Sequence, residues 1–595
     1  MKEKRIYEDL SPLLNKARIT LIVVEVVFIL LLFCFWKIQV LDHNKYWKQS
    51  EANRIREIVL PPQRGLIMDR HGEILATNIA SFKASIIREN CQDFEESCQN
   101  ISQLLEIEQA VLKERINKYK DLPLFQPIVI KDNLALDEVS RIEAHKMEFP
   151  ELIIQSEPKR SYPYKSLAAH VIGYLQEISR EEMEDLYKER RQGDLVGKTG
   201  IEREYEIRLA GKGGRILEIV DSVGRRIDEM SKVNPVPGQD ITLTLDFKLQ
   251  KRAEELLKDR EGAVIVLRPD TGEILALASF PTFDPNKFIN RFTPEEWLTL
   301  LQSSEFPLEN RAIRGLYAPG SIFKLTLALG ALESNVVNEW KTYYCSGSTR
   351  IYGHPFACWF KGGHGSMNLY EGIRNSCNIY FYQLGKMMGI EEIAHYAREL
   401  GFGAKTGVDL PGEKVGLVPD PDWKKRVRQE PWYPGETISV SIGQGPITVT
   451  PLQVTVYTAL IANRGKKVRP HLVHEKTSAE RKEGVVDIRE TSFEKVIRGM
   501  WKSVNDGGTG RAARVDGFNV CGKTGSTQTI STATAEKLGK KSKIVKTHSW
   551  FTGFAPREDT EIVVTILVEY GGMGGATAAP LARELFELYR KDNDR

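Results

Sequence analysis

The sequence has no large excess of positive or negative charge. Its 595 residues include 83 lysines and arginines and 80 acidic residues, and the formal net charge is +3. No basic stripe with interleaved aromatics is present, which argues against a nucleic-acid partner. No segment of roughly 20–50 residues repeats, so the chain is not a solenoid. The length predicts about two to four folded units.

Cysteine is also scarce, and the number of cysteines, seven, is odd. Cys34 lies in an apolar run near the N-terminus. Cys91 and Cys98 are seven residues apart in a polar stretch and would pair only in an oxidising compartment, so the sequence leaves both states open. Three of the other cysteines lie near His364 and are considered below.

Residues 19–40 form the longest apolar run. At about 1.5 Å per residue, a helix of this length crosses a bilayer. No small-x-small cleavage site follows, so we interpret the run as a transmembrane helix rather than a signal peptide. Five lysines and arginines in residues 1–18 predict a cytoplasmic tail, with the rest of the chain outside the cytoplasm. Glu25 within the run is expected near the interface or against a partner's membrane helix.

Two further regions follow the apolar run. Residues 41–235 alternate amphipathic helices with short strands, and 80–160 is expected to be a mobile head section. Residues 234–240, with two prolines and a glycine, are the best candidate for a linker. Beyond it, strand hairpins alternate with helices up to residue 595, which is typical of an α/β or α+β domain on a mainly antiparallel sheet.

The candidate nucleophile is Ser321, which opens an apolar, helix-forming run. A helix starting there places Lys324 one turn later, beside the serine hydroxyl. A serine hydroxyl is a weak nucleophile, and a partly buried lysine can lose its proton and act as the base. The pattern S-x-x-K also occurs at 156–159 and 492–495, so this tetrad alone is not specific.

Two downstream motifs select the tetrad at Ser321 by their order and spacing. The second motif, Ser376-Cys377-Asn378, begins 55 residues after Ser321. The third, Lys523-Thr524-Gly525, begins 147 residues later and follows the strand-like run at 518–522. A similar tripeptide at 198–200 precedes the serine and opens a helix, so we interpret it as structural.

With these motifs the chain resembles the class B penicillin-binding proteins over nearly its whole length. The resemblance is carried by YAPGSIFK, NSCNIYFYQLG, SIGQGPITVTPLQ and CGKTGST, and by the non-catalytic RGLIMDRHGEILA and GKTGIEREYE. It implies an α+β pedestal or dimerisation-like domain at 41–235. A transpeptidase domain at 240–595 would contain a mainly antiparallel five-stranded sheet flanked by helices. Nothing before residue 240 resembles a glycosyltransferase, which argues against a class A enzyme.

The resemblance implies acyl transfer by a D,D-transpeptidase. Ser321 would attack the D-Ala-D-Ala carbonyl of a stem peptide, and β-lactams would remain bound to it. Lys324 would be the general base, alone or in a relay with Ser376, while Asn378 would bind the substrate amide. The backbone N–H groups of Ser321 and Ser526 would form the oxyanion hole. The expected catalytic residues are Ser321, Lys324, Ser376, Asn378 and Lys523, and the expected substrate-binding residues are Thr524, Gly525, Ser526 and Thr527.

No cofactor is expected for catalysis, but a structural metal site is predicted. Its candidate ligands are Cys345, Cys358, His364 and Cys377. Three thiols and an imidazole suit tetrahedral zinc, although the spacing is not that of a zinc finger. Free or disulfide-paired cysteines are the alternative, and His354 is a lesser candidate ligand. Some penicillin-binding protein 2 homologues of the elongation machinery carry ligands at similar spacing, so the resemblance favours zinc.

The resemblance also sets the expected role, partners and location. The Cys/His cluster and the lack of extra C-terminal modules favour the elongation type over the division type. The expected partners are peptidoglycan stem peptides, β-lactams, a RodA-type glycosyltransferase and a MreC-like scaffold. A single pass through the bacterial inner membrane would leave the catalytic domain in the periplasm. The alternatives are a division-type enzyme, a β-lactamase and a β-lactam sensor; carboxypeptidase activity, with water as acceptor, stays open.

Overall fold

The computed structural model describes residues 11–47, 55–122, 124–185, 190, 193–220, 226–289, 292–474, 484–528 and 547–593. The chain divides into two compact units, each assembled from three stretches. The first unit contains Met1–Gln63, Ala80–Pro158 and Lys212–Pro237; the second contains Arg64–Ile79, Lys159–Gly211 and Gly238–Arg595. Two stretches from the first half of the sequence therefore belong to the same unit as the three sequence motifs.

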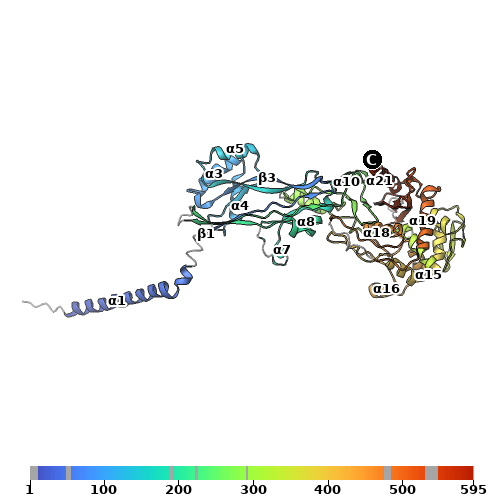
Figure 1. The fold of residues 1–595 in the computed structure, drawn as a ribbon. Coiled ribbons are helices and arrows are strands. Elements are labelled where there is room, and N and C mark those ends of the chain that lie inside the picture. Colours follow the sequence, from blue (N-terminus) through green and yellow to red (C-terminus); the bar gives the residue numbers. More distant parts are fainter. Residues whose placement is uncertain are drawn as a thin grey trace, which may run out of the picture. The chain divides into compact units, whose positions relative to one another are not determined.

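One long helix, α1 (Ser11–Trp36), opens the described chain and is extended by a π-helical turn, η1 (Lys37–Leu41) (Figure 1). Among the residues that the structure describes, only Asn15–Leu41 is long and apolar enough to cross a membrane, and it is not buried against the rest of the chain. A single membrane-compatible helix was expected over 19–40, and it is found there.

The first unit combines antiparallel strands with three helices. Strand β8 (Gly214–Val220) lies between β1 (Ile55–Leu60) and β9 (Arg226–Val233). The last residues of β3 (Ile74–Ile86) pair with β4 (Ile128–Lys131), and β5 (Leu152–Ser161) also pairs with β3. Helices α3 (Phe94–Leu105), α4 (Gln109–Lys118) and α5 (Leu136–Ala144) pack one apolar face each into the core. Cys91 and Cys98 contribute to this core as free thiols.

The second unit is built on a five-stranded antiparallel sheet, which confirms the predicted sheet. Its strand order is β12 (Ile274–Phe280), β11 (Gly262–Leu267), β19 (Ile562–Val568), β18 (Thr547–Ala555) and β17 (Cys521–Gln528). Helices α10 (Phe247–Leu257) and α21 (Ala578–Asn593) cover one face (Figure 1), and α18 (Pro451–Ala462) covers the other. Because both faces are buried, the strands GAVIVL and IVVTILV are almost entirely apolar rather than alternating, with Thr565 as the polar exception.

The remaining elements of this unit are mostly short. The helices are α6 (Ala169–Ile172), α7 (Arg180–Asp185), α8 (Gly200–Glu204), α9 (Glu206–Leu209), α11 (Asn286–Ile289), α12 (Pro294–Gln302), α13 (Lys324–Glu333), α14 (Leu369–Arg374), α15 (Asn378–Glu399), α16 (Pro421–Arg428), α17 (Pro434–Val440) and α19 (Glu490–Asn505). The strands are β2 (Ile67–Met68), β6 (Leu175–Glu177), β7 (Leu195–Gly197), β10 (Ile241–Thr242), β13 (Tyr343–Cys345), β14 (Ser348–Ile351), β15 (His354–Ala357) and β16 (Gly365–Met367).

Two local predictions were wrong. The strand expected at 518–522 begins only at Cys521, so the Lys523-Thr524-Gly525 motif lies inside β17. Glycine and lysine are poor strand formers, and pairing with β18 along its whole length overrides their preference. The helix expected from Ser321 begins only at Lys324; Ser321 lies in a 3-10 turn, η3 (Gly320–Ile322). Residues three apart still share one face of that turn.

A buried ion-pair cluster joins the early stretches of the second unit. The fully buried Glu202 accepts hydrogen bonds from Arg64 Nε at 2.6 Å, Arg160 Nε at 2.7 Å and Tyr162 OH at 3.1 Å. Burial raises the pKa of Glu202, but the Arg160 and Arg64 guanidiniums outweigh burial and hold the pKa below its usual value. Arg160 also donates to the carbonyl of Gly65 at 2.7 Å, so the cluster ties two chain segments 95 residues apart.

Candidate active site

The turn that carries Ser321 is held between two other segments. Gly320 has a φ of +55° and donates its N–H to the Gly443 carbonyl at 2.9 Å. A Cβ at Gly320 would lie 2.4 Å from the Thr527 side chain. Both the left-handed backbone and this close approach require glycine. The turn is therefore fixed against β17 on one side and the segment around Gly443 on the other.

The first two sequence motifs meet at Lys324. Its side chain is fully buried, and its Nζ donates to Ser376 O at 2.8 Å, Ser376 Oγ at 3.3 Å and Asn378 Oδ1 at 2.7 Å. Burial lowers the pKa of Lys324 to about 8, even though the Cys377 and Cys358 thiols raise it. A substantial fraction of the amine is therefore neutral near physiological pH.

Ser376 lies in the short connection between α14 and α15. Its φ is +52°, a left-handed conformation that costs a non-glycine residue about 1–3 kcal/mol. Asn378, the first residue of α15, directs its Oδ1 at Lys324 and donates its Nδ2 to the Ala357 carbonyl at 3.3 Å. Two opposed partners thus set the orientation of the Asn378 amide.

The third motif lies on the edge strand β17. The Lys523 side chain is fully buried and donates its Nζ to the Thr524 carbonyl at 3.1 Å. Burial, together with the nearby charge of Lys324, lowers the pKa of Lys523 well below its usual value. The Ser526 hydroxyl accepts from Gly574 N at 3.0 Å. The buried Thr527 hydroxyl has no hydrogen-bond partner among the described residues.

The structure separates the competing tetrads from this site. Ser492, on α19, donates its hydroxyl to Glu333, and Lys495 pairs with Glu339 at 2.9 Å. Ser156 is exposed on β5, in the first compact unit. Neither tetrad has a neighbouring second and third motif. The tripeptide at 198–200 joins β7 to α8, as its structural interpretation predicted.

Two residues that contact the second motif were missed by sequence reasoning. The Ala357 carbonyl accepts from Asn378, and the Trp359 Nε1–H donates to the Asn375 carbonyl at 3.0 Å. Ala357 and Trp359 flank Cys358, so the sequence signal that could have found them was their position next to a predicted metal ligand.

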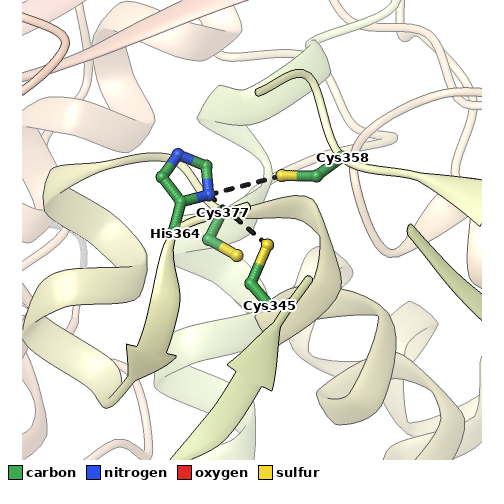
Figure 2. A group of neighbouring side chains, drawn as sticks. All are labelled: Cys345, Cys358, His364 and Cys377. Carbon is green, nitrogen blue, oxygen red and sulfur yellow. Dashed lines mark hydrogen bonds between the residues drawn. The ribbon is translucent and has the colours of Figure 1, made fainter. Parts of the chain in front are cut away.

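The four predicted metal ligands converge (Figure 2). Cys345 ends β13, Cys358 follows β15, His364 precedes β16 and Cys377 precedes α15. Their ligand atoms all lie within 4.8 Å of one another. His364 Nδ1 is 3.5 Å from the Sγ atoms of both Cys345 and Cys358. His354, the lesser candidate, lies exposed at the start of β15 and is not part of the cluster.

This donor set fits a tetrahedral zinc ion. With Zn–S near 2.3 Å and Zn–N near 2.0 Å, tetrahedral angles separate a sulfur from a nitrogen ligand by roughly 3.5 Å. A hydrogen bond from the Cys377 thiol lowers the pKa of Cys358 to about 4, and the same bond raises the pKa of Cys377. A lowered pKa at Cys358 favours its thiolate, the form in which a cysteine ligates a metal.

Comparisons with known proteins agree with this geometry. Residues 262–587 match the Penicillin binding protein transpeptidase domain, and residues 59–243 match the Penicillin-binding Protein dimerisation domain. All of the chain aligns with 89% of the peptidoglycan D,D-transpeptidase MrdA of Acinetobacter baumannii at 36% identity.

Two similar solved structures are informative. One is the complex of penicillin-binding protein 2 with MreC from Helicobacter pylori, with a TM-score of 0.80 and 31% identity over 90% of this chain and 99% of that one. The other is from a peptidoglycan synthase complex, with a TM-score of 0.72 and 30% identity over 97% and 98% of the two chains. The chain therefore belongs to the class B penicillin-binding proteins, in the group of MrdA and penicillin-binding protein 2.

Proposed function

We propose that this chain is a peptidoglycan D,D-transpeptidase of the elongation machinery that works through an acyl-enzyme on Ser321. The observation that carries the proposal is the buried amine of Lys324, one turn after Ser321 and within hydrogen-bond reach of Ser376 and Asn378. Its lowered pKa, about 8, suits a general base that must accept a proton near neutral pH.

In the acylation step, neutral Lys324 takes the Ser321 hydroxyl proton as Oγ forms a bond to the penultimate D-alanine carbonyl carbon. The backbone N–H groups of Ser321 and Ser526 stabilise the oxyanion. The C–N bond to the terminal D-alanine then breaks, and the proton passes to the leaving amine directly or through the Ser376 hydroxyl. An amine of a second stem peptide takes the acyl group and forms the cross-link; water in its place gives carboxypeptidase activity.

Strand β17 supplies the binding surface for the donor peptide. It is the edge strand of the sheet, so among the described residues one side of its backbone has no partner strand, and we propose that the donor peptide adds there. Lys523, Thr524 and Ser526 would hold the substrate's terminal carboxylate. Gly525 packs where a side chain would come within 3.3 Å of Trp550, Pro319 and Ile322, which keeps the strand close to the nucleophile turn.

The acylation is tested by intact-protein mass spectrometry of the full-length chain after incubation with a penicillin. We expect one adduct of the mass of the penicillin, because among the three S-x-x-K tetrads only that of Ser321 has a fully buried lysine. The adduct should disappear in Ser321→Ala and persist in Ser156→Ala and Ser492→Ala. An adduct that survives in Ser321→Ala would contradict the assignment of the nucleophile.

For the Cys/His cluster we propose a structural zinc ion held by Cys345, Cys358, His364 and Cys377. The ion would supply a fixed tetrahedral junction between three β-hairpin strands and the second motif, and it takes no part in the acyl transfer. Cys377 stands between Ser376 and Asn378, so its ligation would hold both neighbouring side chains in place.

Metal analysis of the purified protein should find about one equivalent of zinc. His364→Ala removes one of four ligands and should reduce zinc to below half an equivalent and lower the unfolding temperature. His354→Ala, a histidine outside the cluster, should leave both quantities unchanged. Less than a tenth of an equivalent in the unmodified protein would refute the zinc site.

For location and partners, we propose a single-pass protein of the inner membrane, with the chain that follows the membrane helix in the periplasm. The apolar helix and the five cations before it support this orientation. The similarity to a penicillin-binding protein 2 solved with MreC supports a MreC-like partner. The similarity to a chain of a complex that polymerises and cross-links peptidoglycan supports a partner that polymerises glycan, for which we propose a RodA-type glycosyltransferase. Residues 41–235 would act as the pedestal, with 80–160 as its moving part.

A further inference from the structure

We propose that Trp359 is a positioning residue for the acyl transfer, because its indole N–H fixes the peptide plane that precedes Ser376. The inference rests on the proposed function and adds a residue outside the three motifs. Trp359 follows Cys358 and is 46% exposed, so burial in the core does not explain its place. Its Nε1 donates to the Asn375 carbonyl at 3.0 Å.

The C-terminus of α14 shows why this one hydrogen bond matters. The last carbonyls of a helix lack partners within the helix. Here Cys377 N donates to the Gly372 carbonyl at 3.0 Å, and Ser376 N donates to the Ile373 carbonyl at 3.2 Å. This pair of bonds is the Schellman arrangement, and it places Ser376 at the left-handed position that glycine usually occupies.

The carbonyls of Arg374 and Asn375 are not used in this arrangement, and each accepts a hydrogen bond from a residue elsewhere in the chain. The Arg374 carbonyl accepts from Thr509 N at 3.2 Å, and the Asn375 carbonyl accepts from Trp359. The next carbonyl, that of Ser376, accepts from Lys324 Nζ at 2.8 Å. The Asn375–Ser376 peptide plane determines the φ of Ser376, so the Trp359 bond helps to set where Ser376 O and Oγ meet Lys324.

Trp359 is one of three consecutive residues that lie beside the second motif. The Ala357 carbonyl accepts from Asn378, Cys358 lies within 4.8 Å of Cys377 at the ligand atoms, and Trp359 binds Asn375. The segment 357–359 therefore runs alongside 375–378 and contacts it at each step. Phe360 and His364 pack on the Trp359 ring, with centroid distances of 5.8 Å and 5.4 Å, and hold the indole in place.

The test compares full-length Trp359→Phe with the unmodified protein in saturation kinetics with a fluorescent penicillin. Phenylalanine keeps an aromatic ring and removes only the N–H donor and one ring. We expect the maximal acylation rate constant to fall about tenfold, since the hydrogen bond that fixes the peptide plane before Ser376 is lost. The apparent dissociation constant for penicillin should change less than twofold, and zinc content should be unchanged.

A merely structural role for Trp359 predicts a different pattern. It would lower the active fraction, seen as the final extent of labelling, and the unfolding temperature, without slowing the active molecules. Trp340→Phe makes the same chemical change at an exposed site and should retain the unmodified rate. If Trp359→Phe does not fold, site-specific replacement by benzothienylalanine, which keeps the bicyclic ring without an N–H, should show the same tenfold loss.

Each outcome separates this inference from the proposed function. If the unmodified protein is not acylated at Ser321, the proposed function fails. If the unmodified protein is acylated and either the Phe or the benzothienylalanine variant matches its rate constant, only the role of Trp359 is refuted. A loss of zinc in Trp359→Phe would also refute it, because the rate change would then follow from the metal site.

Discussion

Lys324→Met should react with a fluorescent penicillin about 10³–10⁴-fold more slowly than the unmodified protein. A general base of this kind contributes about 10²–10⁴-fold. Here the removal also leaves Ser376 O and Asn378 Oδ1 without their shared donor. Methionine has nearly the length of the lysine stem and is apolar, so the fully buried site should accept it. The measurement is the second-order acylation rate constant.

The pH profile provides an independent readout of the same prediction. Acylation needs neutral Lys324, whose pKa is lowered to about 8, so the rate of the unmodified protein should rise with pH through about 8 and then level off. Lys324→Met should lack this rise. Lys495→Met changes the lysine of a competing tetrad and should acylate at the normal rate with the normal profile. A Lys324→Met rate within tenfold of normal would contradict the general-base role.

Glu202→Gln should lower the stability of the second compact unit by about 3–5 kcal/mol. The substitution keeps the shape of the side chain but leaves Arg160, itself 3% exposed, as an uncompensated buried charge. Arg64 keeps Glu206 as a partner at 2.6 Å, so the effect comes mainly from Arg160. A calorimetric scan should show the unfolding temperature of this unit lowered by roughly 5–10 °C.

The difference in stability between Glu202→Gln and the unmodified protein should change with pH in a defined direction. The folded-state pKa of Glu202 is depressed, so its stabilising contribution is present above the unfolded-state value of about 4.3. The contribution is lost as pH falls through the folded-state pKa, and the gap between the two proteins should narrow in acid. Glu255→Gln breaks an exposed pair with Arg252 on α10 and should shift the transition by less than 1 °C. An equal effect of both substitutions would refute the burial argument.

Much of the site was predictable from the sequence because its chemistry is concentrated in short motifs. The order and spacing of Ser321, Ser376 and Lys523 selected one tetrad of three, and the structure brings the first two motifs together through Lys324. A metal site was predicted from residue type and resemblance, although the spacing of the four residues is not that of a zinc finger. In the structure their candidate ligand atoms do lie close together. Residue type alone was not decisive, since Cys91 and Cys98 are thiols that pack in a core; order, spacing and resemblance selected the candidate residues.

The parts that were missed depend on backbone groups and on long-range pairing. The Ala357 and Asn375 carbonyls have no sequence signature, so their bonds to Asn378 and Trp359 could not be read from the sequence. Strand β17 contains residues with low strand propensity and exists because β18 pairs with it. The division into units was hidden because each unit gathers stretches far apart in the chain.

The three-stretch construction of the second unit has a consequence for how the chain reaches its native state. Strand β2 at Ile67–Met68 pairs in parallel with β10 at Ile241–Thr242. The Ala168 N–H needs the Glu254 carboxylate on α10. During synthesis β2 must wait for its partner until well over a hundred further residues have been made, and Ala168 must wait for the residue 86 positions later. The first unit ends at residue 237 and can close before then, so it is free to fold first, and the catalytic unit assembles last around segments that were among the earliest to emerge.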